Sequence, residues 1–390
     1  MIDAGGANRS TPVEPAAAPD DPGDPALRAV IAAEIAAGGP ISFARFMELA
    51  LLHPAHGYYA TRPAIGRRGD FVTAPELHAV FGGCLARQAA ELWRAAGAPA
   101  RWTVLEWGAG TGALARDLLA GAQADPAFAA ALDYAIHEVS PVLVEQQRAT
   151  LAAAGLTARW TDDPAPACGI VLANEVLDAL PVHRVTVQGG RLRELLVDWR
   201  DGAFVERPGP PTTGDLAAYL DDGGIRLDEG QVAEINLGAP RWLDRVAARL
   251  AQGAVIVIDY GDDTAGLYGP RRQRGTLLCY ARQTVNEDPY RRVGRQDITA
   301  HVDFGALMRR AERLGLRVAG LTSQGAFLAG LGLAEALLDL QRRLPAVEYV
   351  VQRQAIADLI RPDRLGGFKA LILTRGLPPG LVPSGLRVRL

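Results

Sequence analysis

Acidic residues stand near the ends of several apolar stretches that have the composition of buried strands. Three such acids are Glu106, Glu138 and Glu175, each within two residues of the end of its stretch. The carboxyl ends of parallel strands lie along one edge of an α/β sheet, where such proteins bind ligands. We therefore expect these three carboxylates to lie close together at a ligand site.

A glycine-rich turn follows the first of these acids. The range Thr103–Leu119 has the pattern of a strand, a turn with Gly108, Gly110 and Gly112, and the apolar face of a helix. Because glycine has no Cβ, the backbone can pass close to a ligand and adopt positive φ at little cost. The first amides of the helix, with Thr111 beside them, are then available to a polar group of the ligand.

The chemistry around this turn favours S-adenosylmethionine as the ligand. A carboxylate at Glu106 would repel a pyrophosphate, whereas it attracts an ammonium or hydroxyl groups. Glu138 lies 26 residues after Gly112, close to the spacing at which an acid binds both hydroxyls of a ribose. Two alternatives stay open, because the range 108–113 also fits the looser dinucleotide fingerprint of NAD-binding proteins and because a tight turn needs no ligand.

Two further residues are candidate contacts to the cofactor. Ser140, followed by Pro141, has the sequence of a helix start beside Glu138. Asp162 ends a short stretch with strand character and is a candidate for binding the adenine amino group. Alternatively, Asp162 belongs to a polar turn before Pro164.

Asn174, Glu175 and Asp178 are the candidate catalytic residues. A clear apolar strand ends at Asn174, and the two acids are three residues apart, so a helical turn would present both carboxylates on one side. Methyl transfer from a sulfonium is an in-line displacement in which the protein mainly orients the reactants and excludes water. A guanidinium acceptor, with a pKa above about 12, needs carboxylates that orient it and localise its charge.

Five other residues are candidate substrate contacts. Asp70, Phe71 and Thr73 place an acid, an aromatic ring and a hydroxyl in one glycine-containing loop, which could line a pocket. Alternatively, Asp70 or Thr73 caps the following helix. His183 and His301 are further candidates, and either could act as a general base if the acceptor were a hydroxyl or carboxyl group. His53 and His56 are three residues apart and could bind a metal ion, but no further ligand cluster accompanies them, so no metal site is expected.

The composition argues against several classes of function. The 390-residue chain has a formal net charge of −3 and 22% charged residues, so no basic excess points to nucleic acid or to an anionic membrane surface. No apolar run approaches the roughly twenty residues that cross a bilayer, and we expect no membrane insertion. The three cysteines are far apart without metal-ligand spacing, which is typical of reduced cysteines in a cytoplasmic protein.

The patterns predict an α/β fold in which two parts of a core are separated by an insertion. Near-continuous apolar residues at 252–258 indicate a central parallel strand. Short alternating runs broken by glycine and proline indicate antiparallel strands that cover the site. The predicted parts are a disordered tail at 1–25, an N-terminal helical and substrate-loop segment at 26–100, the first part of the core at 101–184, a β-rich insertion at 185–238, and the second part of the core at 239–380 with a helical insertion at about 325–362.

Six segments together resemble the MidA-like methyltransferases, the family of the mitochondrial complex I assembly factor that methylates arginine. The resemblance runs from about Ile41 to Arg375. The glycine turn alone is generic, whereas the first and fourth segments are specific. The six segments are Gly69–Glu76, Leu105–Gly112, Glu138–Pro141, Ala173–His183, Ile258–Gly261 and Asp297–Phe304.

The resemblance implies a Rossmann-like class I methyltransferase sheet, S-adenosylmethionine as methyl donor, and an arginine of a protein partner as acceptor, with Glu175 and Asp178 binding the guanidinium. A subunit of respiratory complex I is the partner it suggests, and a homodimer is compatible with the sequence. The range 283–286 departs from the family pattern, in which we expect a histidine, and could line the acceptor pocket. Two other functions stay open: methylation of a small-molecule hydroxyl or carboxyl group, and a non-catalytic role in assembly.

Overall fold

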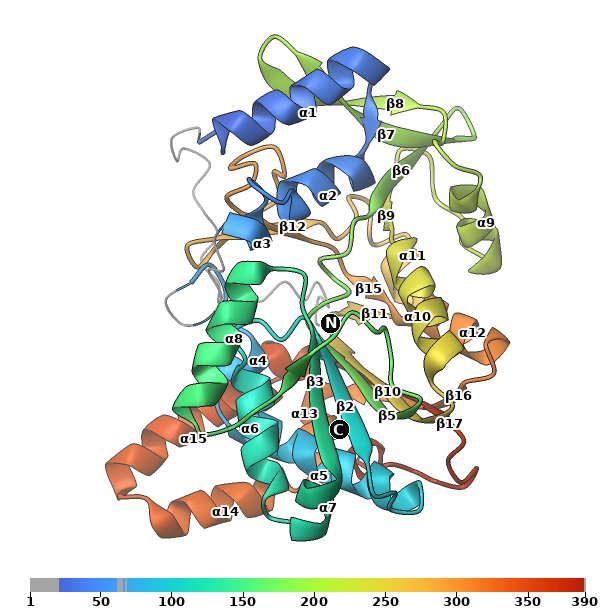
Figure 1. The fold of residues 1–390 in the computed structure, drawn as a ribbon. Coiled ribbons are helices and arrows are strands. Elements are labelled where there is room, and N and C mark those ends of the chain that lie inside the picture. The colour runs from blue at the N-terminus through green and yellow to red at the C-terminus, as the bar shows by residue number, and fades with distance from the viewer. Residues whose placement is uncertain (1–20, 62–65, 67–68, 389–390) are drawn as a thin grey trace.

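The protein is built around a seven-stranded sheet in the computed structural model, which describes residues 21–61, 66 and 69–388 (Figure 1). The strand order is β16-β17-β10-β5-β2-β3-β4. The pairs from β10 to β4 are parallel, and β17 is antiparallel to both of its neighbours. The strands are β2 (Trp102–Trp107), β3 (Leu132–His137), β4 (Arg159–Trp160), β5 (Cys168–Asn174), β10 (Gln252–Asp259), β16 (Arg317–Ser323) and β17 (Lys369–Arg375).

The sheet contains a topological switch point at β2. After β2 the chain adds β3 and β4 on one side of it, and then β5 and β10 on the other. The chain connections that leave β2 and β5 therefore diverge to opposite sides, and a crevice forms beyond the carboxyl ends of these strands. This arrangement confirms the predicted α/β fold class.

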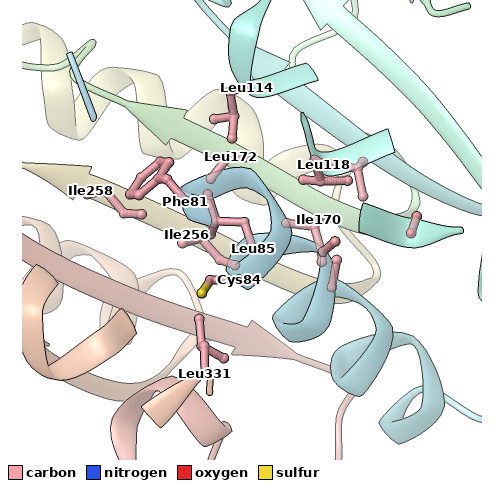
Figure 2. Packing of buried hydrophobic residues seen from close by; sticks show 14 of the residues in the cluster. Phe81, Cys84, Leu85, Leu114, Leu118, Ile170, Leu172, Ile256, Ile258 and Leu331 are labelled. Atoms are coloured by element: carbon pink, nitrogen blue, oxygen red, sulfur yellow. The ribbon is translucent and has the colours of Figure 1, made fainter. Parts of the chain in front are cut away.

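Helices cover both faces of the sheet, which is why its central strands are almost entirely apolar. Alternate residues of β10 serve the two faces, so that Ile256 packs in one cluster and Val257 in the other. Figure 2 shows the first face, where Phe81 and Leu85 pack with Leu172. This face carries α5 (Val80–Ala95), α6 (Ala113–Ala122), α7 (Pro126–Ala131), α8 (Pro141–Ala153), α13 (Gln324–Gly330), α14 (Leu333–Arg343) and α15 (Ala346–Ile360), and the other carries α10 (Gly238–Arg249) and α12 (Phe304–Arg313).

A second body, at the top of Figure 1, joins the N-terminal helices to antiparallel strands. Its core packs Leu27 and Phe46 of the helices against Val197, Phe204 and Ile298 of the strands. One sheet has the order β1-β7-β6-β9 with β8 beside β7, and a small one has the order β13-β12-β14. The elements are α1 (Pro25–Gly38), β1 (Ile41–Ser42), α2 (Phe43–Leu52), α3 (Tyr58–Thr61), β6 (His183–Gln188), β7 (Arg191–Arg200), β8 (Ala203–Gly209), α9 (Asp215–Asp222), β9 (Val232–Ile235), β12 (Leu278–Ala281), β13 (Thr284–Asn286) and β14 (Asp297–Thr299).

The last residues of the predicted disordered tail are ordered, which corrects that expectation for 21–25. The Asp24 carboxylate caps α1 by accepting hydrogen bonds from the N–H groups of Ala26 and Leu27. The backbone N–H of Asp24 also donates to the carbonyl of Val293 at 2.8 Å, which ties the start of α1 to a distant loop. Residues 1–20 lie outside the described residues.

Short elements complete the chain. Among the described residues, no helix is both long enough and apolar enough to span a membrane. The short elements are α4 (Ala74–Leu77), β11 (Gly261–Asp262), α11 (Thr264–Tyr268), β15 (Val302–Asp303) and two 3₁₀ turns at Leu365–Gly367 and Ser384–Leu386.

Candidate active site

A cleft of about 330 Å³ opens beyond the carboxyl ends of β2, β3 and β5, at the switch point of the sheet. We call it the glycine cleft. Chain segments that are far apart in the sequence meet in its walls. The predicted residues among its lining are Phe71, Thr73, Glu106, Gly108, Gly110, Thr111, Glu138, Asn174 and Glu175.

The glycine turn has the backbone conformation that its sequence predicts. Gly108, Gly110 and Gly112 have φ values of 61°, 53° and 84°. A Cβ on Gly108 would lie 3.1 Å from a methyl group of Val176, and a Cβ on Gly112 would lie 3.1 Å from the Cα of Gln147. Gly112 does not itself line the cleft, so it shapes the turn and allows α6 to pack on α8.

Glu138 is held in the cleft wall by two hydrogen-bond donors. Its carboxylate accepts from the N–H of Ser140 at 2.9 Å and from Nε2 of Gln147 at 3.0 Å. Ser140 does not line the cleft, and its hydroxyl donates to the carbonyl of Tyr59 at 2.7 Å and caps α8. The predicted contact of Ser140 with the cofactor is therefore corrected to a positioning role.

Glu106 lies in the cleft wall but is only 2% exposed. Tyr134 donates its hydroxyl to the carboxyl group at 2.7 Å. Burial raises the pKa of Glu106 to about 8, because water no longer stabilises the charged form. The group is therefore mainly protonated at neutral pH and offers hydrogen bonds rather than the full negative charge that we expected.

Glu76 is a cleft residue that the sequence analysis did not select. It lies in α4, lines the glycine cleft, and accepts a hydrogen bond from the hydroxyl of Thr111. This bond links α4 to the glycine turn. The sequence does contain a signal for Glu76, because this residue ends the family-specific segment Gly69–Glu76. Asp70 and Thr73 of the same segment were selected instead.

Asp162 is exposed and does not line the glycine cleft, which corrects its predicted contact with adenine. β4 ends at Trp160, so the chain has already turned away at this point. His137, which does line the cleft, is held by the Thr161 carbonyl at 3.0 Å from its Nδ1. Burial lowers the pKa of His137, and this hydrogen bond and, more weakly, the charge of Asp162 oppose that shift.

A second cavity, of about 250 Å³, adjoins the glycine cleft, and we call it the acid cavity. The two spaces share Tyr59, Phe71 and Glu175 in their walls. Arg364 also lines it. The acids among its lining residues are Asp70, Glu175, Asp178, Asp297 and Asp358, and the aromatic residues are Tyr59, Phe71, Tyr260, Tyr280 and Phe368.

Glu175 stands at the junction of the two spaces in a strained conformation. Its φ is 53°, a left-handed value that is uncommon for a residue with a side chain. The predicted helical turn is therefore wrong: the chain bends sharply after β5, and the N–H of Glu175 donates to the carbonyl of Ile258. The carboxylate accepts from the N–H of Ala74 at 3.1 Å, and burial raises its pKa to about 8.

Asp259 at the end of β10 stabilises this bend. Its carboxylate accepts hydrogen bonds from the N–H groups of Val176, Leu177 and Asp178 at 3.0 to 3.3 Å. The bend brings the side chain of Asp178 into the acid cavity, where its Oδ1 is buried and has no hydrogen-bond partner. Burial raises the pKa of Asp178, and the nearby Tyr260 hydroxyl and backbone N–H groups only partly oppose that shift. A cation or donor that reached Oδ1 would stabilise the ionised carboxylate.

Asp70 and Asp297 are oriented by tyrosines in the opposite wall of the cavity. The hydroxyl of Tyr58 donates to Asp70 at 2.9 Å, and that of Tyr59 donates to Asp297 at 2.9 Å. Burial raises the pKa of Asp297, and the nearby charge of Asp178 adds to the shift. The sequence analysis missed Tyr59 and Asp297, because no local pattern shows that they meet residues far away in the chain.

The loop at 283–286 reaches the acid cavity through Gln283, as its departure from the family pattern suggested. Its side-chain amide donates to the carbonyl of Gly69 at 2.7 Å. The predicted β insertion at 185–238 contains α9 in addition to strands. None of its residues lines the glycine cleft or the acid cavity, so the small sheet β13-β12-β14 covers the site instead.

The two predicted histidines differ in position. His183 lies in β6, where its Nδ1 is 2.7 Å from Oε1 of Glu194, and it lines neither space, which corrects its predicted contact with substrate. His301 lines the acid cavity, and burial lowers its pKa to about 3. Such an imidazole is a weak base. In the part of the chain that the structure describes, no group of histidine, cysteine and acidic side chains is arranged to hold a metal ion.

The glycine cleft fits S-adenosylmethionine. The turn leaves its backbone open to a ligand, and Glu138 is held as a hydrogen-bond acceptor. Asn174 Oδ1 is buried beside the cleft without a partner, so it can accept a hydrogen bond from a ligand.

Known proteins share this arrangement. The model of a family described as "Putative S-adenosyl-L-methionine-dependent methyltransferase" matches residues 84–322. A Burkholderia thailandensis protein whose crystal structure holds S-adenosyl-homocysteine is 38% identical, with a TM-score of 0.85 over 93% of this chain and 95% of that chain. The mitochondrial protein arginine methyltransferase NDUFAF7 homolog of Drosophila melanogaster is 29% identical over 91% of this chain and 86% of its own length. The human protein arginine methyltransferase NDUFAF7 is 28% identical over 89% and 82%. The chain therefore belongs to this methyltransferase family, and it is an enzyme that uses S-adenosylmethionine as its methyl donor.

Proposed function

We propose that this enzyme methylates the guanidinium group of an arginine side chain in a protein substrate. The observation that carries the proposal is the unpartnered Oδ1 of Asp178, buried in a cavity that adjoins the glycine cleft and is lined by further acids. A buried acceptor without a donor is costly unless a ligand supplies the donor. The relatives named above are protein arginine methyltransferases, which supports the same acceptor.

The acid cavity suits a guanidinium in both charge and shape. A guanidinium carries five N–H donors in a planar fork and stays charged at any physiological pH. Glu175 and Asp178 offer carboxylates at one end of the cavity, and Asp297 offers another. The rings of Tyr260 and Tyr280 in the walls favour a flat cation that can lie against an aromatic face.

S-adenosylmethionine, when bound, supplies an electrophilic methyl group on a sulfonium. Glu138, with Gln147 behind it, would hold the ribose hydroxyls, while Glu76 is the candidate for the ammonium group. Asn174 offers its carbonyl oxygen at the same wall. The acids of the adjoining cavity would orient the acceptor nitrogen toward the cleft.

Glu175 is the candidate proton acceptor. The nitrogen that gains a methyl group must lose one proton if the product is to remain a single cation. Glu175 is in both walls, and its raised pKa of about 8 makes it basic enough to take that proton. Glu175 is protonated in the free enzyme at neutral pH, so binding of the cationic acceptor must first release that proton to solvent.

A hydroxyl or carboxyl acceptor is less well supported. The two histidines proposed as the general base for that function do not provide one, since His183 is engaged with Glu194 and burial lowers the pKa of His301 to about 3. A carboxyl acceptor would also face several acids in the cavity wall. A subunit of respiratory complex I is the first protein acceptor we propose to test, because the family resemblance suggests it.

The test is transfer of a labelled methyl group from S-adenosylmethionine to arginine-containing peptides and to a purified complex I fraction. We expect label in methylarginine after acid hydrolysis and none with the Glu175→Gln variant. A Gly110→Val variant should lose donor binding in a calorimetric titration. Label found only in base-labile esters or in small molecules would reject the arginine assignment.

A further inference from the structure

A third cavity, of about 280 Å³, lies behind one wall of the acid cavity. The two cavities share Leu278 and His301 in their linings. The third cavity lies between β6 and β9 of the insertion and the segment that leads into β12. We call it the arginine pocket, and its lining is Arg184, Val232, Arg272, Arg274, Gly275, Thr276, Leu277, Leu278, Glu287 and His301.

The lining of the arginine pocket has three guanidinium groups and one carboxylate. Arg184 is mostly buried, and it is fixed by Glu206 and by Glu234, whose Oε1 lies 3.4 Å from its Nε. Arg274 pairs with Glu287 at 3.0 Å, but both side chains are largely exposed, so a ligand can exchange with this pair at little cost.

His301 reports the electrostatic character of the pocket. The charge of Arg272 adds to burial in lowering the pKa of His301. The backbone N–H of His301 donates to the hydroxyl of Thr276 at 3.1 Å. The ring Nδ1 of His301 is buried and has no hydrogen-bond partner. A neutral imidazole with a free nitrogen next to an arginine can donate a hydrogen bond to an anion in its Nδ1–H tautomer.

We propose that the arginine pocket binds the carboxylate of an aspartate or glutamate that lies near the target arginine in the acceptor protein. This inference rests on the proposed function and adds a preference for acceptor sequence. The shared wall places the carboxylate site beside the cavity for the guanidinium. A guanidinium group can donate two parallel hydrogen bonds to one carboxylate. This bidentate geometry makes the preference for an acidic residue in the acceptor specific.

The test uses a set of nonapeptides with a central arginine, serine elsewhere, and one glutamate moved through every other position. We expect glutamate at one or two positions to raise kcat/KM about tenfold over the all-serine peptide, which corresponds to about 1.4 kcal/mol. Arg272→Ala should reduce this ratio to near one. Arg271→Ala removes the same charge from an exposed neighbour outside the pocket, so it should leave the ratio unchanged.

The inference would be overturned by equal rates for all peptides, by equal effects of the two arginine variants, or by stronger binding of a phosphoserine peptide than of the glutamate peptide. Binding of fluorescent peptides in which norleucine replaces arginine separates this inference from the proposed function. Arg272-dependent binding of the glutamate peptide would support the pocket even if no arginine were methylated. Equal competition by free acetate would show that the pocket takes any small carboxylate, and would also reject acceptor selection.

Discussion

The glycine cleft and the acid cavity share a wall but are built in opposite ways. One wall of the cleft is a continuous segment at 106–114 whose shape comes from backbone conformation, and more distant residues such as Glu76, Glu138 and Asn174 complete it. The cavity is formed by side chains from segments as distant as Tyr59 and Phe368, and its character comes from buried acids. The donor is therefore recognised by a turn, whereas the acceptor is recognised by charge.

This difference predicts where substitutions act. A change in the backbone of the turn should affect donor binding alone, and a change of charge in the cavity should affect acceptor binding alone. Glu175 lines both the glycine cleft and the acid cavity. A substitution there is therefore the strictest test of whether donor binding and acceptor binding can be changed separately.

The largest effect is expected from Glu175→Gln, because it removes an acid that orients the acceptor and takes its proton. We expect kcat to fall by roughly a thousandfold, the upper range for loss of one preorganised group. Calorimetric titration should show that the Kd for S-adenosyl-homocysteine changes by less than about threefold. Loss of donor binding together with activity would show that Glu175 belongs functionally to the cleft.

Gly110→Val should weaken donor binding by at least about a hundredfold, or about 2.8 kcal/mol, because φ is 53° and the side chain would enter the cleft. Gly155→Val is the matched control. Gly155 has φ of 66° and open space around it, at an exposed site far from the turn in the chain. Both variants should lose a similar amount of stability. If only Gly110→Val also loses donor affinity, the result supports the assignment of Gly110 to the donor site. Equal loss of affinity would contradict it.

Asp178→Asn should raise the KM for an arginine peptide by roughly tenfold to a hundredfold, since a hydrogen bond to a charged partner contributes about 1.5–3 kcal/mol. The Kd for S-adenosylmethionine should stay constant, because Asp178 lines only the acid cavity. The same exchange at Asp162, which is exposed and outside both spaces, serves as control. An unchanged KM would remove Asp178 from the acceptor site.

Activity and stability should respond to pH in opposite directions. Acceptor binding needs ionised Glu175, whose pKa is about 8, so kcat/KM should rise about tenfold per pH unit below 8 and level off above it. The folded protein holds protons on Glu106 and Glu175 that the unfolded chain releases near pH 4.5. Their contribution to the free energy of unfolding is therefore present below pH 4.5 and is lost as the pH rises toward 8.

Thermal unfolding between pH 5 and 9 measures how the stability of the protein depends on the protonation of Glu106 and Glu175. Glu106→Gln imitates the protonated acid and keeps an acceptor for Tyr134, so its unfolding temperature should vary less with pH than that of the wild type. An unchanged pH dependence in the variant would show that Glu106 is ionised in the folded protein over this range.

The smallest effect on catalysis is expected from His183→Gln. His183 contacts Glu194 in the antiparallel body and reaches neither space, so kcat should change by less than about twofold. Stability should fall by about 1–3 kcal/mol, because Glu194 is fully buried and loses the imidazole while keeping only the N–H of Thr212 at 2.6 Å. A large fall in kcat at unchanged stability would instead favour a histidine base and a different acceptor.

The sequence was sufficient for the glycine turn of the cleft, because the parts of that turn are adjacent in the chain. A strand, alternating glycines and a helix are local patterns, and Glu138 follows at the spacing of the next strand. Asp162 and Ser140 were misplaced, because spacing alone cannot show whether an acid after a strand turns toward the ligand or a hydroxyl turns toward the backbone.

The acid cavity could be predicted only in part. Glu175 and Asp178 were found because they follow a strand, but their expected helical turn is wrong: Asp259, 81 residues after Asp178, accepts from the N–H groups of the bend and fixes another conformation. Tyr59 and Asp297 are 238 residues apart and form their hydrogen bond only through the tertiary fold. No periodicity in a single sequence reports such a contact.

The common wall of Tyr59, Phe71 and Glu175 has a thermodynamic consequence for the two ligands. A ligand that reorients these side chains from one side changes the free energy of binding on the other side. Linkage then requires reciprocity: whatever factor the donor applies to acceptor affinity, the acceptor applies to donor affinity. Because the cationic acceptor also displaces a proton from Glu175, donor affinity, acceptor affinity and pH form a single linked equilibrium.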